Sequence, residues 1–413
     1  MNKEGWQIKT LGDIADVKGG KRVPKGYKLQ SVPTKYPYIT VSDFTDEGTI
    51  DTSDLRYVSR EVFEQIKRYT ISSNDLYLSI AGTIGKTGYV PIELDGASLT
   101  ENACKLVLRP GIDRNFVYYF TKSDGFTTQA GTNTRTAAQP KLALERLKTI
   151  KLPIPLSFPE QQRIVGVLDE AFAGLATAKA NAEKNLQNAR ALFESHLQSV
   201  FTQRGKGWVE KTLGDESLLE IIDGDRGANY PKADDFRDEG HCLFLNTKNV
   251  RPDGFEFDST MFITAGKDGQ LRKGKLKRGD VIMTTRGTIG NIGYYSDDVP
   301  FDHVRINSGM LIFRTNKSVL LPEYFFEILR SPVVKDQIRT LTTGAAQPQL
   351  PIKTLVNFKI PVPAKLEDQI SIVEKLKNFE PETQRLESIY QQKLEALAEL
   401  KKSLLHQAFT GNL

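Results

Sequence analysis

A series of short motifs occurs twice in this 413-residue chain, in the same order and about 205 residues apart. Small drifts in that spacing are what short loop insertions between similar repeats produce. Chance does not give two ordered sets of matches, so the chain is a tandem duplication. The matched pairs are Trp6 and Leu11–Asp13 with Trp208 and Leu213–Asp215, Tyr38–Asp43 with Phe244–Asn249, Gly82–Tyr89 with Gly287–Tyr294, Ala137–Pro140 with Ala345–Pro348, and Leu152–Pro155 with Ile360–Pro363.

Each repeat ends in a long segment with helical periodicity. Residues 160–201 contain no proline and two glycines, and Pro159 stands where a helix can begin without losing a backbone hydrogen bond. Apolar residues recur there at alternating steps of four and three when Lys179 and His196 are counted, which is the a/d pattern of a coiled coil. The pattern predicts a helix roughly 60 Å long. A helix of that length needs a partner.

The second repeat supplies a partner helix over residues 366–409, in which Pro381 is expected to kink or interrupt the early turns. Glu160–Gln162 corresponds to Glu367–Gln369 at the two helix starts. Joining the chain ends would nearly recreate the link between the two repeats, so we expect a two-fold relation with antiparallel helices. The expected seam sets Leu168, Phe172, Leu175, Leu186 and Phe193 against Leu386, Tyr390, Leu397 and Leu404.

Each globular segment is about 155 residues long, near the usual size of a domain. Short strand candidates alternate there with glycine-rich turns, and helical patches follow. In the first copy the strand candidates are Tyr38–Val41, Asp75–Ile80 and Cys104–Leu108, and the helical patches lie near Phe116–Lys122 and Pro140–Lys148. The expected fold class is α+β, with two pseudo-symmetric α/β domains separated by two long antiparallel helices that form a coiled coil. The expected boundaries are 1–158 and 204–364 for the globular domains, and 159–203 and 365–413 for the helices.

The charge and hydropathy of the chain indicate where the protein works and what kind of partner it contacts. No run of residues is apolar enough for a membrane span and the start of the chain carries no signal segment, so we expect a cytoplasmic protein. Residues 1–158 hold 22 Lys and Arg against 17 Asp and Glu, while the helices are nearly balanced. This distribution suits globular domains that contact an anionic partner and helices that contact protein. An ordinary solvated surface explains the charge equally well.

No active site is recognisable in the sequence. Residues 80–87 resemble a phosphate-binding loop, but Ile80 replaces its first glycine, and Asn291 and Ile292 replace the lysine and threonine in the second copy. A tight glycine turn between two strands is favoured there. The four histidines and two cysteines do not fall at metal-ligand spacings, and no methyl-donor loop is present. We therefore expect a non-catalytic chain with no cofactor and no metal.

A basic cluster stands out in the second repeat, where residues 272–278 carry five positive charges in seven positions. Its counterpart in the first repeat, residues 67–73, is much less basic. Phosphate contact by such a cluster adds salt dependence to DNA binding without adding sequence preference. A solvated loop is the alternative interpretation.

Over essentially its whole length, the chain resembles the specificity subunit of type I restriction–modification enzymes. The resemblance rests on the duplicated plan and on motifs at Trp6, Leu11–Ile14, Ile39–Phe44, Gly82–Gly85, Gln139–Pro140, Pro153–Pro155, Glu160–Val165 and Phe409–Gly411. It implies that each globule is a target recognition domain for one half of a split sequence in double-stranded DNA. It also implies that the helices form a spacer that docks two modification (methyltransferase) subunits, and that restriction (translocase–nuclease) subunits join the complex. In that family the specificity subunit itself has no catalytic activity.

Base reading needs polar side chains at the groove edges, and the repeat positions suggest which residues supply them. Helix capping and turn closure are the alternative roles for the same residue types. The candidates are Thr40, Ser42, Thr83, Thr132, Asn133, Thr134 and Arg135 in the first copy, and Lys248, Asn249, Arg286, Thr288, Thr342 and Thr343 in the second, with Arg272, Lys273 and Lys275 for phosphate.

The alternative function is a non-catalytic coiled-coil adaptor that joins protein partners without reading DNA. Such an adaptor would also have a duplicated helical plan. It would not need two basic globules whose loops diverge while the strands and turns around them repeat. That divergence favours DNA recognition and predicts two different half-sites, so the full target should be asymmetric.

Overall fold

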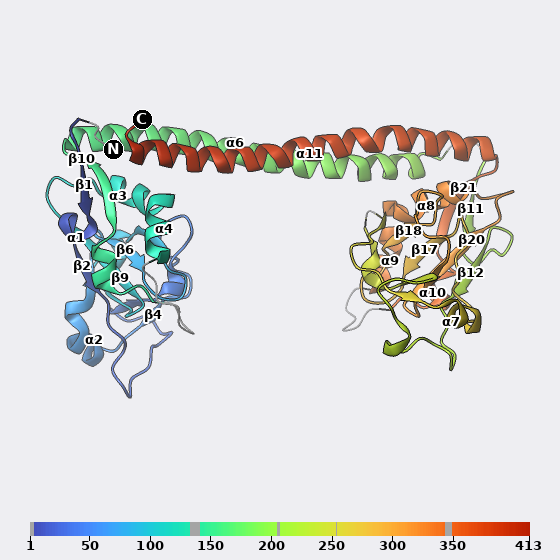
Figure 1. Ribbon diagram of the computed structural model, residues 1–413, viewed down its shortest axis with the longest axis horizontal. Coiled ribbons are helices and arrows are strands. Elements are labelled where there is room, and N and C mark those ends of the chain that lie inside the picture. The colour runs from blue at the N-terminus through green and yellow to red at the C-terminus, as the bar shows by residue number, and fades with distance from the viewer. Residues whose placement is uncertain (1–3, 133–140, 205–206, 253, 343–348) are drawn as a thin grey trace. The chain divides into compact units, whose positions relative to one another are not determined.

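The computed structural model describes residues 4–132, 141–204, 207–252, 254–342 and 349–413. The chain divides into two compact units, Met1–Glu183 with Gln392–Leu413, and Lys184–Gln391. Each unit contains one globular domain and a segment of each of two long helices (Figure 1). The expected α+β class with two long helices is confirmed.

The domain of the first unit is built on two four-stranded sheets with helices against them. The first sheet is antiparallel, in the order β2 (Ala15–Gly19), β9 (Ala103–Leu108), β6 (Leu76–Ser79), β7 (Thr87–Tyr89). The second has the order β4 (Arg56–Tyr57), β3 (Pro37–Ile39), β8 (Ala97–Leu99), β5 (Thr70–Ile71), and β3 runs parallel to β8. The strand β1 (Trp6–Thr10) pairs with β10 (Lys151–Pro155). The helices of this domain are α1 (Leu11–Ile14), α2 (Arg60–Ile66), α3 (Arg114–Thr121), α4 (Asp124–Thr132) and α5 (Leu144–Lys148).

The domain of the second unit repeats this plan. Its antiparallel sheet has the order β12 (Leu219–Asp223), β20 (Met310–Thr315), β17 (Val281–Thr284), β18 (Ile292–Tyr294). A second sheet has the order β16 (Phe262–Ile263), β13 (Cys242–Leu245), β19 (Val304–Ile306), and again contains one parallel pair, β13 with β19. The strand β11 (Trp208–Thr212) pairs with β21 (Lys359–Pro363), and β14 (Val250–Arg251) forms a hairpin with β15 (Gly254–Phe255). The helices of this domain are α7 (Ala265–Gln270), α8 (Pro322–Arg330), α9 (Pro332–Thr342) and α10 (Ile352–Leu355).

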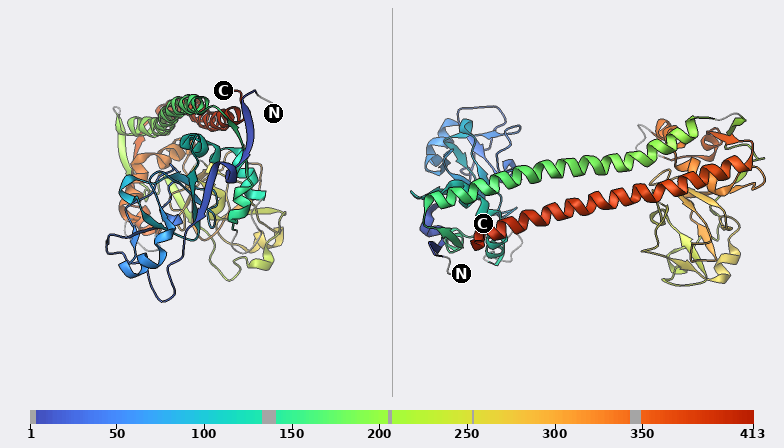
Figure 2. Two further views of the ribbon diagram at one scale, coloured as in Figure 1. Left: turned by 90° about the vertical axis from the view of Figure 1, so that its left-hand side faces the viewer. Right: turned by 90° about the horizontal axis from the view of Figure 1, so that it is seen from above.

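The two long helices are α6 (Phe158–Thr202) and α11 (Leu366–Thr410), and each has 45 residues. Within the first unit, the Lys401 amine lies 5.3 Å from the centre of the Phe172 ring. Within the second, Arg190 pairs with Glu387 at 3.2 Å. Early residues of α6 therefore meet late residues of α11, so the helices are antiparallel, as Figure 2 shows. No helix in the described ranges is long and apolar enough to cross a membrane.

Each domain shares its hydrophobic core with the helix segments of its own unit. In the first unit, the rings of Phe116 and Phe120 in α3 lie 5.1 and 5.4 Å from the ring of Phe409 in α11. In the second unit, Tyr324 of α8 contacts Phe201 of α6 in the same way, at 5.6 Å. Apolar burial therefore fixes each domain to the helix end beside it.

The helix seam differs from the expected one at two positions, and the proline of α11 does not have its expected effect. Leu386 is 38% exposed, and Lys179 is exposed while its neighbour Ala178 is half-buried. Pro381 does not interrupt α11, which continues from Leu366 to Thr410. Burial of Leu376 and Thr383 on either side of the proline offsets the backbone hydrogen bond that it cannot donate.

Two buried glutamines tie the starts of the long helices to the domains. The Gln161 amide donates to the carbonyls of Gly111 and Pro155 and accepts from the Asp113 N–H at 2.8 Å. Gln369 makes the same three contacts, with Val319, Pro363 and the Leu321 N–H. Gln161 is thus the partner of Gln369 in the repeat. The sequence match, which set Gln162 opposite Gln369, was wrong by one residue.

A buried carboxyl group lies between α8 and α11. Glu327 is 5% exposed, one of its oxygens has no hydrogen-bond partner among the described residues, and Arg330 lies 3.7 Å from the other. Burial raises the pKa of Glu327 to about 7, and the opposing effect of Arg330 is smaller. Below about pH 7 the folded protein therefore favours the neutral acid.

We expect Glu327→Gln to remove a pH-dependent loss of stability. The pKa of Glu327 is higher in the folded than in the unfolded chain, so stability falls as pH rises from about 4.5 to about 7 and then levels off. Glutamine mimics the neutral acid, so the variant should match the wild type at pH 5 and exceed it at pH 8 by on the order of 2 kcal/mol. Urea unfolding at both pH values tests this, with the exposed Glu374→Gln as control. An equal gain at both pH values would contradict it.

Candidate nucleic-acid interface

A Gly-Thr-Ile-Gly turn joins two strands of the antiparallel sheet in each domain. Its glycines have positive φ: +74° and +96° at Gly82 and Gly85, and +73° and +87° at Gly287 and Gly290. Glycine adopts this conformation without strain. The buried hydroxyl of the preceding strand donates to the threonine carbonyl, Ser79 to Thr83 and Thr284 to Thr288. The expected tight turn is confirmed, and it holds a threonine side chain out to solvent.

Two adjoining cavities open beside this turn in the second domain. One, of about 200 Å³, is lined by Arg286 and Thr285, by Arg226 and Asp223, and by Gln349. The other, of about 260 Å³, is lined by Arg226, Arg272 and Lys273 together with Asp223 and Asp225. Arg226 and Asp223 line both cavities, so four cations gather at one side of this domain.

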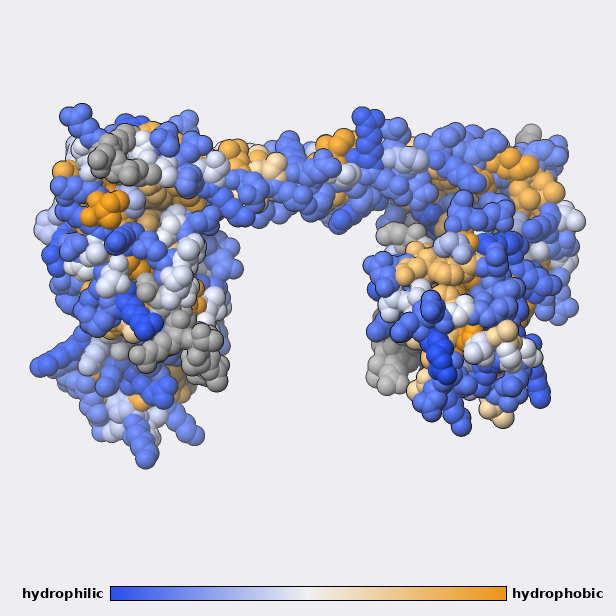
Figure 3. Space-filling model, in the orientation of Figure 1, coloured by the Kyte–Doolittle hydropathy of each residue, from blue (hydrophilic) through white to orange (hydrophobic). Residues whose placement is uncertain are grey.

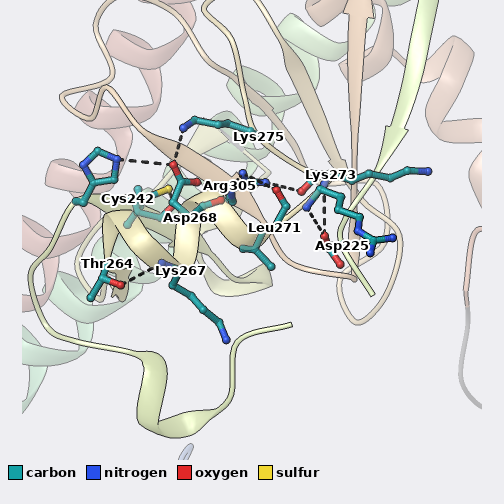
Figure 4. Close-up of polar contacts among 12 residues, drawn as sticks. Asp225, Cys242, Thr264, Lys267, Asp268, Leu271, Lys273, Lys275 and Arg305 are labelled. Atoms are coloured by element: carbon teal, nitrogen blue, oxygen red, sulfur yellow. Dashed lines mark hydrogen bonds and ion pairs between the residues drawn. The ribbon is translucent and has the colours of Figure 1, made fainter. Parts of the chain in front are cut away.

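The basic segment, residues 272–278, is held to the domain through its backbone (Figure 4). Asp225 accepts from the Arg272 N–H at 2.7 Å, and Arg305 donates to the Lys273 carbonyl at 2.7 Å. The Gly227 N–H and then the Arg272 N–H hold the pKa of Asp225 below its usual value. The side chains of Arg272 and Lys273 are exposed and make no hydrogen bond or ion pair within the described ranges. They are free to contact an anion.

A buried ion pair fixes the other side of the basic segment. Asp268 and Arg305 are 4% and 5% exposed and bond to each other, and Lys275 also bonds to Asp268. Burial raises the pKa of Asp268, but the bonds from Lys275 and Arg305 outweigh it, so the pKa lies below the ordinary value. The Asp268 carboxylate is therefore ionised at neutral pH. Lys275, a candidate phosphate ligand, bonds to Asp268 while its side chain remains 43% exposed.

The base-reading candidates of the first domain that the structure describes occupy three separate places. Thr40 and Asp43 form a capping box around a 3-10 turn, in which the Thr40 N–H donates to Asp43 at 2.7 Å, while Ser42 is exposed. Thr83 is exposed on the glycine turn. Thr132 is the last residue of α4 rather than part of a loop, and its hydroxyl donates back to the Thr128 carbonyl. Asn133, Thr134 and Arg135 lie outside the described residues, as do Ala137–Pro140.

Asn249 of the second domain is not available to read a base. It is 1% exposed; its amide oxygen accepts from the Asn246 N–H, and its nitrogen donates to the carbonyls of Glu256 and Ser259. The amide is used up inside the protein because it closes the loop after β13. Lys248, Arg286 and Thr288 are exposed. Thr342 ends α9, while Thr343 and Ala345–Pro348 lie outside the described residues.

Sequence reasoning missed Arg226 and Gln349, both of which line the cavity beside Arg286. Arg226 has a counterpart in Arg22, because each arginine lies three residues after the last residue of an equivalent strand, β12 or β2. That spacing could have identified the pair. No group of three or more His, Cys, Asp or Glu residues that could hold a metal ion occurs in the described part of the chain.

Two copies of one framework, each with an exposed threonine on a fixed glycine turn and each attached to the long helices, define a duplicated subunit. The chain belongs to the family of type I restriction modification DNA specificity domains, which matches residues 3–186 and 205–396. It is the DNA specificity subunit of a type I restriction–modification system, with two target recognition domains and no catalytic role of its own. It functions as part of a type I complex.

Curated relatives and solved structures agree with this assignment. The specificity subunit of the MjaVIII enzyme from Methanocaldococcus jannaschii is 25% identical, over 99% of this chain and 93% of the relative. The specificity subunit of the EcoBI enzyme from Escherichia coli is 22% identical, over 99% of this chain and 86% of the relative. The HsdS subunit from Thermoanaerobacter tengcongensis shares the fold, with a TM-score of 0.62 at 19% identity over 99% of this chain and 98% of that one. A second solved structure concerns the assembly and conformational transition of the type I R-M system. One of its chains has a TM-score of 0.80 with this chain at 18% sequence identity, and the match covers 100% of both chains.

We expect the double variant Arg272→Gln, Lys273→Gln to bind all DNA sequences more weakly by a similar factor. Each side chain that neutralises a phosphate releases a counterion, so the slope of log affinity against log salt concentration should fall by about 2. Fluorescence anisotropy at several salt concentrations measures this slope. Lys317→Gln, which removes an exposed charge beyond the far end of β20, is the control and should leave the slope unchanged. A changed sequence preference would contradict phosphate contact.

Proposed function

We propose that each target recognition domain reads one half of an asymmetric, bipartite target in double-stranded DNA. The observation that carries this proposal is the retained framework with exchanged side chains. The glycine turns and paired strands repeat, but the basic segment and the residues beside the turn differ between the copies. Two different readers in one chain require two different half-sites. Non-catalytic adaptors need no such divergence.

The chemistry of the exposed side chains suggests which of them contact phosphates and which contact bases. Arg272 and Lys273 present free cations on a backbone anchored at both sides, which suits contact with phosphates. Thr83, Thr288 and Arg286 stand on or beside the fixed turns, which suits contact with base edges in the major groove. Thr40, Ser42 and Lys248 belong to the turns that follow β3 and β13, and we propose them as further contacts.

Selection from randomised duplexes tests the proposal. The full chain, assembled with its modification subunits, should enrich two short sequences separated by a fixed gap, and the two should differ. Enrichment of a single or palindromic sequence would contradict two independent readers. Stable assembly with no enrichment would support the adaptor instead.

We further propose that α6 and α11 dock two modification subunits, one near each repeat, that restriction subunits join this complex, and that it works in the cytoplasm. The functional division is 1–158, 159–203, 204–364 and 365–413. The side of the helices seen in Figure 3 is mainly hydrophilic, which suits docking through polar and charged contacts.

Charge reversal on the exposed face of α6 is expected to abolish this docking. Glu170 and Lys184 are exposed and lie on one side of α6, because fourteen residues make about four turns. Glu170→Lys with Lys184→Glu should therefore leave the helix intact and remove complementary charges. Size-exclusion chromatography with the modification subunit measures assembly, and circular dichroism checks helix content. Lys317→Glu, on the second domain, is the control. Unchanged assembly of the double variant would argue against docking at this face.

A further inference from the structure

Beside the glycine turn, the two domains keep the same backbone pairing but exchange the side chains on it. In the first domain Ala81 forms an isolated antiparallel bridge with Lys141, and in the second Arg286 forms the equivalent bridge with Gln349. Ala81 and Arg286 each directly precede the first glycine of the turn. The cation thus lies on the turn side of the bridge in one domain and on the opposite side in the other. A purely structural bridge would not require this exchange.

In the second domain both members of the bridge line the smaller cavity. Arg286 is exposed, and its guanidinium makes no hydrogen bond or ion pair with the described residues. Arg226, on the same cavity, is held by Asp223 at 3.2 Å and by the Ser308 carbonyl at 3.3 Å. The cavity therefore combines one fixed guanidinium with one free guanidinium and one exposed amide.

The first domain fixes its corresponding arginine by different partners. Arg22 bonds to the Glu101 carboxylate, and Glu101, two residues before β9, matches Ser308, two residues before β20. Each domain thus has a held arginine next to the bridge. The members of the bridge itself are all chemically different: alanine and lysine in one domain, arginine and glutamine in the other.

We propose that this cross-strand pair is the specificity-determining element of each target recognition domain, an inference that rests on the proposed function. Arginine and lysine bond guanine O6 and N7, glutamine bonds adenine N6 and N7, and alanine contacts the thymine methyl group. Facing side chains on paired strands start about 5 Å apart, close enough to reach neighbouring base pairs. Arg286 reads guanine and Gln349 adenine in one half-site. Lys141 reads guanine and Ala81 thymine in the other.

Exchanging the pairs between the domains tests this. The variant Arg286→Ala, Gln349→Lys places the first domain's pair in the second domain. In duplex selection with the modification subunits, it should change one or two adjacent bases of one half-site, with preference for the original bases reduced roughly ten- to one-hundred-fold. The other half-site and the gap should not change. The reciprocal variant, Ala81→Arg, Lys141→Gln, should change only the other half-site.

Three further measurements separate base reading from other roles. Arg286→Lys should retain the guanine preference at lower affinity, and Lys317→Ala should leave all preferences unchanged. All variants should unfold at the wild-type temperature, because the bridge is made by backbone atoms. Uniformly weaker binding with the original preference would overturn the specificity assignment alone. A wild-type complex without any bipartite target would overturn both this inference and the proposed function.

Discussion

Replacing Asp268 with alanine is expected to cost the second domain about 3–5 kcal/mol of its free energy of unfolding. The substitution leaves the Arg305 guanidinium buried without its counter-ion, although Arg305 keeps the carbonyls of Leu271 and Lys273 as acceptors. It also releases Lys275. Urea unfolding measures the loss, and hydrogen exchange at Arg272 and Lys273 should show that the basic segment opens more often.

Two further variants make this result specific to the buried pair. Asp302→Ala removes a carboxylate that pairs with Arg278 but is 91% exposed, so its effect should be small. Asp268→Ala with Arg305→Ser removes both charges and should be less destabilised than Asp268→Ala alone. Equal losses for Asp268→Ala and Asp302→Ala would show that the buried pair has no special weight.

The first domain fills the place of this buried ion pair with uncharged side chains. Equivalent positions follow from the bridges of Thr70 to Ser98 and of Lys275 to Arg305, and from the matched capped helices α2 and α7. Phe63, Ser98 and Thr70 there replace Asp268, Arg305 and Lys275. A hydrophobic cluster that includes Val62 and Ile66 stabilises α2. Two kinds of core thus support one framework, and each leaves a different surface loop.

Much of the fold could be predicted because the repeat doubled the evidence for each element. The strands at 76–79 and 103–108 and both long helices were found within a few residues of their ends. Helix α4 was missed because its sequence, with Gly125, Thr127 and Thr128, has low helix propensity. Burial of Phe126 and the bonds of Gln129 to the Lys151 backbone stabilise it instead. Contacts of that range cannot be read from local sequence.

The candidate site was less predictable, because polarity does not report burial. Ser42 and Asn249 both follow a strand and looked equally suitable as base readers, yet one is exposed and the other is fully bonded inside the protein. Gln349 and Arg286 lie 63 residues apart in the chain and meet only through the bridge beside the turn. The repeated motifs identified the glycine turns in the sequence. Only the pairing of distant segments in the folded chain shows which side chains lie next to those turns.

Removal of the buried glutamines should loosen the attachment of each domain to its helix. Gln161 is 1% exposed and Gln369 is 0% exposed, so alanine at either position leaves one backbone N–H and one buried carbonyl, that of Pro155 or Pro363, without a partner. Each such group costs about 1–3 kcal/mol, so we expect each variant to lose about 2–4 kcal/mol of unfolding free energy. The N–H groups of Asp113 and Leu321 should exchange faster in the corresponding variants.

Gln162 offers a matched control, because it is adjacent to Gln161, of the same residue type, and exposed. Gln162→Ala should be nearly neutral, since alanine is also the better helix former. Gln161→Ala should affect exchange in the first domain and Gln369→Ala in the second, because each amide contacts only its own unit. If Gln161→Ala and Gln162→Ala were equally mild, the apolar contacts of Phe409 and Phe201 would be sufficient to hold the domains, and the duplicated glutamine would have no measurable role in the attachment.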